Sequence, residues 1–171
     1  CKLAGATVIG LTGSAEKCGW LVEELGYDIA INYKDVDWYE QLVDAAPERL
    51  DVIFDNVGGS ILDESLRLIG MHGVVLLCGS TSQYSEEEMS GPSNYIWLGT
   101  MRARMQGFVI FDYAERYPEA RAKMARWVRD GRLKIPSYEM AGDVDAFPEA
   151  FQQLYQGKNL GKMLLKLPAA T

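Results

Sequence analysis

The strongest constraint on the fold of this 171-residue chain is a regular alternation of short apolar segments with longer amphipathic ones. The short segments are rich in β-branched residues, which favours buried strands, and the longer ones carry the apolar spacing of helices. The predicted strands are residues 7–12, 28–33, 50–54, 73–78 and 105–110, and the predicted helices between them are residues 15–25, 35–46, 61–69 and 95–101. This alternation predicts an α/β fold with a Rossmann-type, doubly wound parallel sheet.

The pattern changes towards the end of the chain. A helix is predicted over residues 118–129, and Gly131 ends it. The predicted elements beyond it are an extended stretch, a helix and a strand, at residues 134–140, 146–155 and 162–167. We therefore expect a nucleotide-binding domain at residues 1–131 and a separate C-terminal segment at residues 132–171.

Composition excludes several classes of function. A net charge of −7 argues against nucleic acid as a partner, because a phosphate backbone requires a basic face. The apolar runs are far shorter than the ~20 residues of a membrane span. Three cysteines without C-x-x-C spacing and one histidine, His72, do not provide the ligands of a zinc site, so we expect no metal. Free thiols suggest a reducing cytoplasm.

Ligands of a doubly wound sheet lie at the carboxyl ends of its strands. The first strand ends in T-G-S-A-E-K, where Ser14 caps a helix and Lys17 follows. Lys17 is a candidate ligand for the 2′-phosphate of NADP, aided by Ser14 at the helix N-terminus; the alternative is a solvated surface lysine. The second strand ends in Tyr33 and Lys34, and Tyr33 either donates to the same phosphate or packs.

The next two strands also end in small and polar residues. The third leads into D-N-V-G-G, where Asn56 can both donate and accept hydrogen bonds and Gly58 and Gly59 let a ligand approach the backbone. The fourth leads into C-G-S-T-S-Q-Y, which suits a flat ring. Four such strand ends in succession predict a nucleotide site.

The ordered segments G-S-A-E-K, L-G-Y-D-I-A-I-N-Y-K, D-V-I-F-D-N-V-G-G, C-G-S-T-S-Q-Y, R-M-Q-G-F and G-K-N-L-G-K resemble the medium-chain dehydrogenase/reductase superfamily. The resemblance is to its zinc-independent branch of prostaglandin reductases, alkenal double-bond reductases and curcumin reductases, and it covers residues 2–167. It implies an NADP(H)-dependent enzyme that transfers a hydride to the C=C bond of an α,β-unsaturated ketone or aldehyde and then protonates the enolate.

The resemblance also implies residue roles. Lys17 and Tyr33 would hold the 2′-phosphate, and the Tyr84 hydroxyl, or a cofactor ribose hydroxyl held by it, would be the catalytic donor. The remaining residues implied to line the cofactor are Asn56, Cys78, Gly79, Ser80, Phe108, Val109, Ile110 and Asn159. His72 in M-H-G is expected to be a turn before a strand rather than an acid.

The same resemblance implies parts that precede residue 1. Family members carry a central strand, a glycine-rich turn and an N-terminal GroES-like catalytic domain upstream of the K-L-A-G-A segment, and the tail would return to that domain. We therefore expect a polypeptide of roughly twice this length, typical of two domains, a homodimer in its full-length form, with the present chain inactive alone. Alternatives are a quinone reductase of the same superfamily, a non-catalytic nucleotide-binding module, and a methyltransferase, which would favour an acid where Tyr33 stands.

Overall fold

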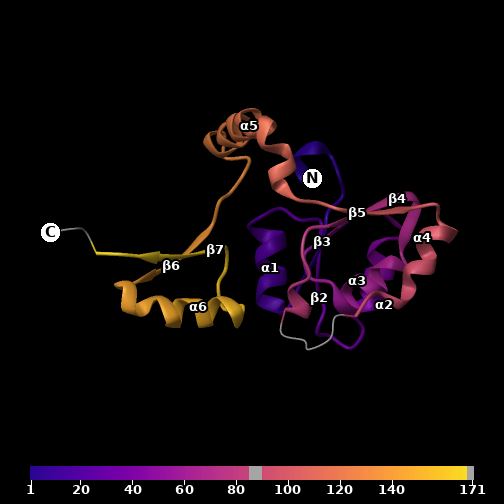
Figure 1. Ribbon diagram of the computed structural model, residues 1–171, viewed down its shortest axis with the longest axis horizontal. Helices are drawn as coiled ribbons and strands as arrows, with labels where there is room; N and C mark the ends of the chain where they lie inside the picture. Colours follow the sequence, from indigo (N-terminus) through magenta and orange to yellow (C-terminus); the bar gives the residue numbers. More distant parts are fainter. Residues whose placement is uncertain (85–89, 169–171) are drawn as a thin grey trace. The chain divides into compact units, whose positions relative to one another are not determined.

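The computed structural model describes residues 1–84 and 90–168. The chain divides into two compact units, Cys1–Tyr117 (the first unit) and Pro118–Thr171 (the second unit). Figure 1 colours the first unit from indigo to pink and the second from orange to yellow. The predicted division after residue 131 concerns packing in a complete protein and stays a prediction.

The first unit contains every strand and helix predicted for it, with ends shifted by a few residues. Its strands are β1 (Ile9–Thr12), β2 (Ile29–Asn32), β3 (Leu50–Asp55), β4 (Ile69–Leu77) and β5 (Arg104–Gly107). Its α-helices are α1 (Ala15–Glu23), α2 (Trp38–Ala45), α3 (Gly59–Leu66) and α4 (Ile96–Thr100). The predicted loop between β4 and α4 includes residues 85–89, which lie outside the described residues.

All strand pairs in the first unit are parallel, as predicted, but they form two sheets. β1 pairs with β2, and β4 lies between β3 and β5. Among the described residues, no ladder joins β1 to β3, so each of these strands has one hydrogen-bonded neighbour. The carboxyl ends of the five strands therefore remain the place to seek a ligand site.

Two apolar cores hold the first unit together. Leu62 and Leu66 of α3 pack with Ile69 and Val75 of β4, and α4 covers the same cluster. The second core joins α2 to the β1–β2 sheet and reaches β3: Ile31, Leu42 and Leu68 are buried in it, with Ile9, Leu11, Ile29 and Leu50 packed around them. The second core is thus what connects the two sheets.

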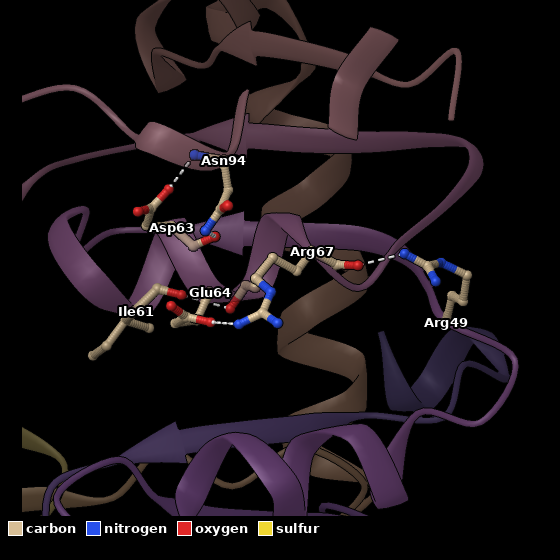
Figure 2. A network of polar contacts seen from close by, with 7 residues as sticks. Arg49, Ile61, Asp63, Glu64, Arg67 and Asn94 are labelled. Atoms are coloured by element: carbon tan, nitrogen blue, oxygen red, sulfur yellow. Dashed lines mark hydrogen bonds and ion pairs between the residues drawn. The ribbon is translucent and has the colours of Figure 1, made fainter. Parts of the chain in front are cut away.

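The start of β4 corrects the sequence analysis at Ile69, which we expected to be the last residue of a helix. The Arg49 guanidinium donates to the carbonyl oxygens of Arg67 and Ile69, the latter at 2.9 Å from Nε, so these carbonyls do not continue α3. Figure 2 shows the hydrogen bond to the Arg67 carbonyl oxygen from Arg49, which directly precedes the first residue of β3. Ile69 instead pairs with Leu50 as the first residue of β4.

Two further boundaries differ from the prediction. The turn expected at His72 is an irregularity within β4, because the register jumps from the Leu50–Ile69 pair to the Val52–Val74 pair and His72 adopts a left-handed φ of 61°. β5 ends at Gly107, and Ile110, expected in that strand, begins the 3-10 segment η4 (Ile110–Arg116).

The second unit contains α5 (Tyr117–Arg129, which begins one residue before the unit boundary), β6 (Ser137–Ala141), α6 (Phe147–Tyr155) and β7 (Lys162–Lys166). These match the helix, extended stretch, helix and strand predicted for the tail. β6 and β7 form a parallel pair with α6 between them in the chain. Within residues 1–84 and 90–168, no helix has the length and apolar character needed to cross a membrane.

Candidate cofactor and active site

The end of β1 and the start of α1 place Ser14 and Lys17 together. Ser14 has extended backbone (φ −160°, ψ 152°), and its Oγ accepts a hydrogen bond from the Lys17 backbone N–H at 3.2 Å. This is the N-cap interaction predicted for Ser14, and it leaves the Ser14 hydroxyl proton available for an anion. Lys17 is half-buried in the first turn, where the helix dipole favours a negatively charged ligand.

Tyr33 belongs to the same edge because β1 and β2 are adjacent and parallel. Its backbone N–H donates to the Thr12 carbonyl oxygen at 2.9 Å, which extends the ladder beyond β2. A Cβ added to Gly13 would lie 2.9 Å from the Tyr33 hydroxyl oxygen and 3.3 Å from Cε of Lys34. The Tyr33 hydroxyl therefore packs directly against the backbone of Gly13, and a Cβ at this position would crowd it.

One carboxylate also lies near this edge. Asp35 accepts a hydrogen bond from the Asn32 side-chain amide at 2.6 Å, and the Asn32 Oδ1 accepts one from the Lys34 backbone N–H at 3.3 Å. Asp35 is thus part of the turn after β2, whereas Tyr33 faces Gly13. The grouping of Ser14, Lys17 and Tyr33 that the sequence predicts is what the fold brings together here.

At the end of β3, the fold reveals a residue that sequence reasoning missed. Asp55 is 5% exposed, and its carboxylate accepts hydrogen bonds from the backbone N–H groups of Val57 and Gly58, each at 3.1 Å. Gly58 adopts φ 70° and ψ −155°, which a residue with a side chain rarely adopts. An Asp side chain that accepts from the backbone N–H two residues later, as Asp55 does from Val57, forms an Asx-turn. The segment D-N-V-G-G could therefore have indicated the role of Asp55.

The ends of β3, β4 and β5 enclose a cavity of about 680 Å³. The lining residues that directly follow β4 and β5 include the predicted Cys78, Gly79, Ser80, Phe108 and Val109. Phe108 is held in place by Tyr113, whose ring stacks on it with centroids 5.2 Å apart. The structure therefore gathers these five predicted residues around one space, which is of a size suited to a small ligand.

Cys78 lines this cavity without being a nucleophile. Burial raises the pKa of the Cys78 thiol, and the negative charge of Asp55 raises it further. Its ordinary pKa already lies above neutrality, so the thiol carries its proton at neutral pH. Cys78 can thus shape the cavity wall, but it is not poised to attack a substrate.

Asn56 and Tyr84 lie beside the cavity rather than in its lining. A Cβ added to Gly79 would lie 3.2 Å from the Asn56 carbonyl oxygen and 3.6 Å from the Tyr84 hydroxyl, so both residues meet at Gly79. Tyr84 is 67% exposed. Ile110 is exposed in η4 and is not among the residues that line the cavity.

Asn159 belongs to the second unit, where its side-chain amide donates to the Gly161 carbonyl oxygen at 2.7 Å. Its predicted closure over the cofactor stays a prediction.

The segment around Tyr84 is held by contacts that sequence reasoning did not identify. Ser82, in the short 3-10 segment η2 (Thr81–Gln83), donates from Oγ to the Val57 carbonyl oxygen at 2.6 Å. The Gln83 side chain accepts from the Ser90 backbone N–H at 2.9 Å. No local sequence signal marks these pairs, because each joins residues that only the fold brings together.

In the part of the chain that the structure describes, no group of three or more His, Cys, Asp or Glu side chains could hold a metal ion. The metal-independent site stays a prediction.

Comparisons with known proteins give the site its context. The chain is 34% identical to the NADPH-dependent curcumin reductase of Escherichia coli over 172 residues and 35% identical to the NADP(+)-dependent 2-alkenal reductase of Nicotiana tabacum over 169 residues. These matches cover 97% and 96% of the chain but 50% and 48% of the two relatives, so the chain spans about half their length.

Solved structures agree with these sequence matches. CurA from Vibrio vulnificus in complex with NADPH superposes with a TM-score of 0.90 at 35% identity, covering 99% of this chain and 52% of that one. Residues 1–126 match the family described as zinc-binding dehydrogenase. The chain therefore belongs to the zinc-binding dehydrogenase family of the medium-chain dehydrogenase/reductase superfamily.

Proposed function

We propose that this chain is the cofactor-binding half of an NADPH-dependent reductase that acts on the C=C bond of α,β-unsaturated ketones and aldehydes. The observation that carries the proposal is a pair of features at the carboxyl ends of the strands. Ser14, Lys17 and Tyr33 lie at the β1–β2 edge, and a small, mostly uncharged cavity lies at the ends of β3 to β5. The names of the relatives, curcumin reductase and 2-alkenal reductase, point to the same substrate class.

The residues at the β1–β2 edge fit the 2′-phosphate of NADP. Lys17 supplies a cation, and the hydroxyls of Ser14 and Tyr33 supply donors, which together satisfy a phosphate better than the diol of NAD. The Tyr33 hydroxyl lies on this edge, where a Cβ added to Gly13 would come within 2.9 Å of its oxygen. NADP(H), rather than NAD(H), is therefore the cofactor we assign.

The cavity fits the reactive end of the same cofactor. NADPH, when bound, supplies the hydride for the reduction. Cys78, Gly79 and Ser80 would bound its ribose, with Asn56 beside them, and Phe108 and Val109 would bound its amide. The role predicted for Ile110 has no support from this lining, because Ile110 lies outside it. The raised pKa of Cys78 keeps its thiol protonated, so this side chain adds no charge to the wall.

Tyr84 is the residue we assign to proton handling. Its hydroxyl lies against Gly79, next to the cavity, and more than half of the side chain is exposed. The O–H group of a phenol can donate a hydrogen bond to a developing enolate oxygen. Tyr84 would do so directly or by holding a ribose hydroxyl in place.

The complete enzyme, in this proposal, is longer than this chain. The second unit would pack on a GroES-like catalytic domain, with Asn159 closing over the cofactor, and the full-length protein would be a cytoplasmic homodimer. Turnover by this chain alone is not expected, since half of the relatives' length has no counterpart in it.

The proposal is tested with the complete natural polypeptide, NADPH and benzylideneacetone, in the presence of excess chelator. We expect NADPH consumption and the saturated ketone as product, at the same rate with and without chelator. Reduction of a quinone but not of the enone would favour the alternative within the superfamily. NADPH binding without turnover of either substrate would favour a binding module.

Replacing Gly13 by Ala should weaken NADPH binding by about 10-fold, the effect of one hydrogen bond to a charged group. The added Cβ would lie 2.9 Å from the Tyr33 hydroxyl oxygen, so the phenol must move. Gly13 is not among the glycines with a left-handed φ, so alanine fits its backbone. Titration calorimetry with NADPH and NADH measures the effect, and NADH affinity should change little.

The matched variant is Tyr33→Phe, which removes the hydroxyl without crowding. If Gly13→Ala acts through that hydroxyl, the double variant should bind NADPH no more weakly than Tyr33→Phe alone. Additive losses would show that Gly13 acts by another route.

A further inference from the structure

Asp63 and Asn94 tether α3 to a distant segment of the chain. The Asp63 Oδ1 accepts a hydrogen bond from the Asn94 backbone N–H at 2.7 Å, and the Asn94 side-chain amide donates to the Asp63 carbonyl oxygen at 3.1 Å. The two residues are 31 positions apart and both are half-buried. Figure 2 shows the Asn94 backbone and side chain both turned towards Asp63.

The tether lies at the wall of the cavity. Asp63 is one of the lining residues, and so are Gly91, Pro92 and Ser93, which immediately precede Asn94. Asn94 is the middle residue of η3 (Ser93–Tyr95), which leads directly into α4. The bond to Asp63 therefore sets where this wall ends and where α4 begins.

The opposite wall is attached to the same helix. At the N-terminus of α3, Asp55 holds the Gly58 backbone N–H, and Ser82 holds the Val57 carbonyl oxygen. Leu62 and Leu66 anchor α3 in the first core, so the helix is a rigid support. Two parts of the cavity lining are thus attached to one helix, at its N-terminus through Val57 and Gly58 and further along it through Asp63.

We propose that Asp63 is a positioning residue for the unsaturated substrate, acting through Asn94 and the Gly91–Ser93 wall. The inference rests on the proposed reductase function and adds a residue to it. Asp63 neither reacts nor holds the 2′-phosphate, whose donors lie at the β1–β2 edge. Its carboxylate holds the Gly91–Ser93 wall, through Asn94, in the position that lets the substrate bind.

The expected consequence is a change in KM rather than in kcat. If the tether is lost, the wall occupies its binding-competent position for only part of the time, and apparent affinity falls by that fraction. A hydrogen bond to a charged group shifts such an equilibrium by about 10-fold or more. The chemical step from the bound complex is unchanged, so kcat should stay within about twofold.

The experiment measures KM, kcat and the NADPH dissociation constant in the complete polypeptide, with benzylideneacetone as substrate. Asp63→Ala should raise KM by about 10-fold, with kcat and NADPH affinity nearly unchanged. Asp63→Asn keeps an oxygen that accepts from the Asn94 N–H and should restore KM to within about twofold. Glu64→Ala is the matched control, because this neighbouring acid pairs with exposed Arg67, at 2.6 Å, and lies outside the cavity lining, so KM should be unaltered.

Each outcome decides between the two proposals. A wild-type enzyme that does not reduce the enone refutes the proposed function, and the substrate role of Asp63 with it. An active wild type with an unchanged KM for Asp63→Ala, or equal damage from Asp63→Asn, overturns the Asp63 proposal alone. If Asp63→Ala does not fold, Asn94→Pro decides, because proline has neither the backbone N–H nor the side-chain amide that bond to Asp63. It should raise KM by about 10-fold, and an unchanged KM would overturn the tether.

Discussion

Replacing Lys17 by Ala in the complete polypeptide should weaken NADPH binding by about 10- to 100-fold and leave NADH binding nearly unchanged. A charge-assisted hydrogen bond to phosphate contributes about 1.5–3 kcal/mol, and NADH lacks the 2′-phosphate that would receive it. The structure places Lys17 in the first turn of α1, beside the Ser14 cap and on the edge that Tyr33 shares. Calorimetric titration with both cofactors measures the difference.

A matched control separates this local effect from net charge. Arg104→Ala removes one positive charge at the start of β5, whereas the cavity lies beyond the end of that strand at Gly107. It should change both affinities little, since exposed charges more than a Debye length apart are screened. Equal losses of NADPH and NADH affinity in Lys17→Ala would refute the assignment of the 2′-phosphate site.

The second large effect concerns the chain on its own. Expressed as residues 1–171, it should show neither a cooperative thermal transition nor NADPH-dependent turnover, whereas the complete polypeptide should show both. β1 and β3 each have one hydrogen-bonded neighbour among the described residues, which leaves backbone groups of two inner strands without a ladder partner. An upstream strand between them would supply those partners.

Hydrogen exchange makes this expectation specific to two strands. Amides of β1 and β3 should exchange far more slowly in the complete polypeptide than in residues 1–171. β4 is the internal comparison, because it is flanked by β3 and β5 in this chain already and should change less than its neighbour β3. A natural protein of only these 171 residues that unfolds cooperatively and turns over substrate would contradict the expectation.

Local patterns in the sequence predicted the elements well. Every strand and helix inferred from apolar spacing is present, because such spacing reflects which face of an element is buried. The boundaries at Ile69 and Ile110 were wrong. At Ile69 the deciding contact comes from Arg49, twenty positions away, and no window of neighbouring residues contains it.

The site was predictable only in part. Ser14, Lys17 and Tyr33 follow two strand ends, and parallel pairing of β1 with β2 brings such ends to one edge without further information. Asp55 was missed although D-N-V-G-G carries a local turn signal, so that omission was avoidable. Asp63 carries no signal, since an acid on an amphipathic helix is ordinarily solvated.

Sequence patterns were thus enough to predict the order of strands and helices, the family, and the small and polar residues that follow the strands. These features depend on short-range periodicity and on the geometry shared by parallel sheets. The folded chain was needed to show that a Cβ at Gly13 would crowd the Tyr33 hydroxyl, and that α3 contacts two parts of the cavity lining through Gly58 and Asp63. Such contacts depend on which distant segments the loops bring together. A hydrogen bond between residues 31 positions apart cannot be predicted from local patterns, because it imposes no pattern on the residues between them.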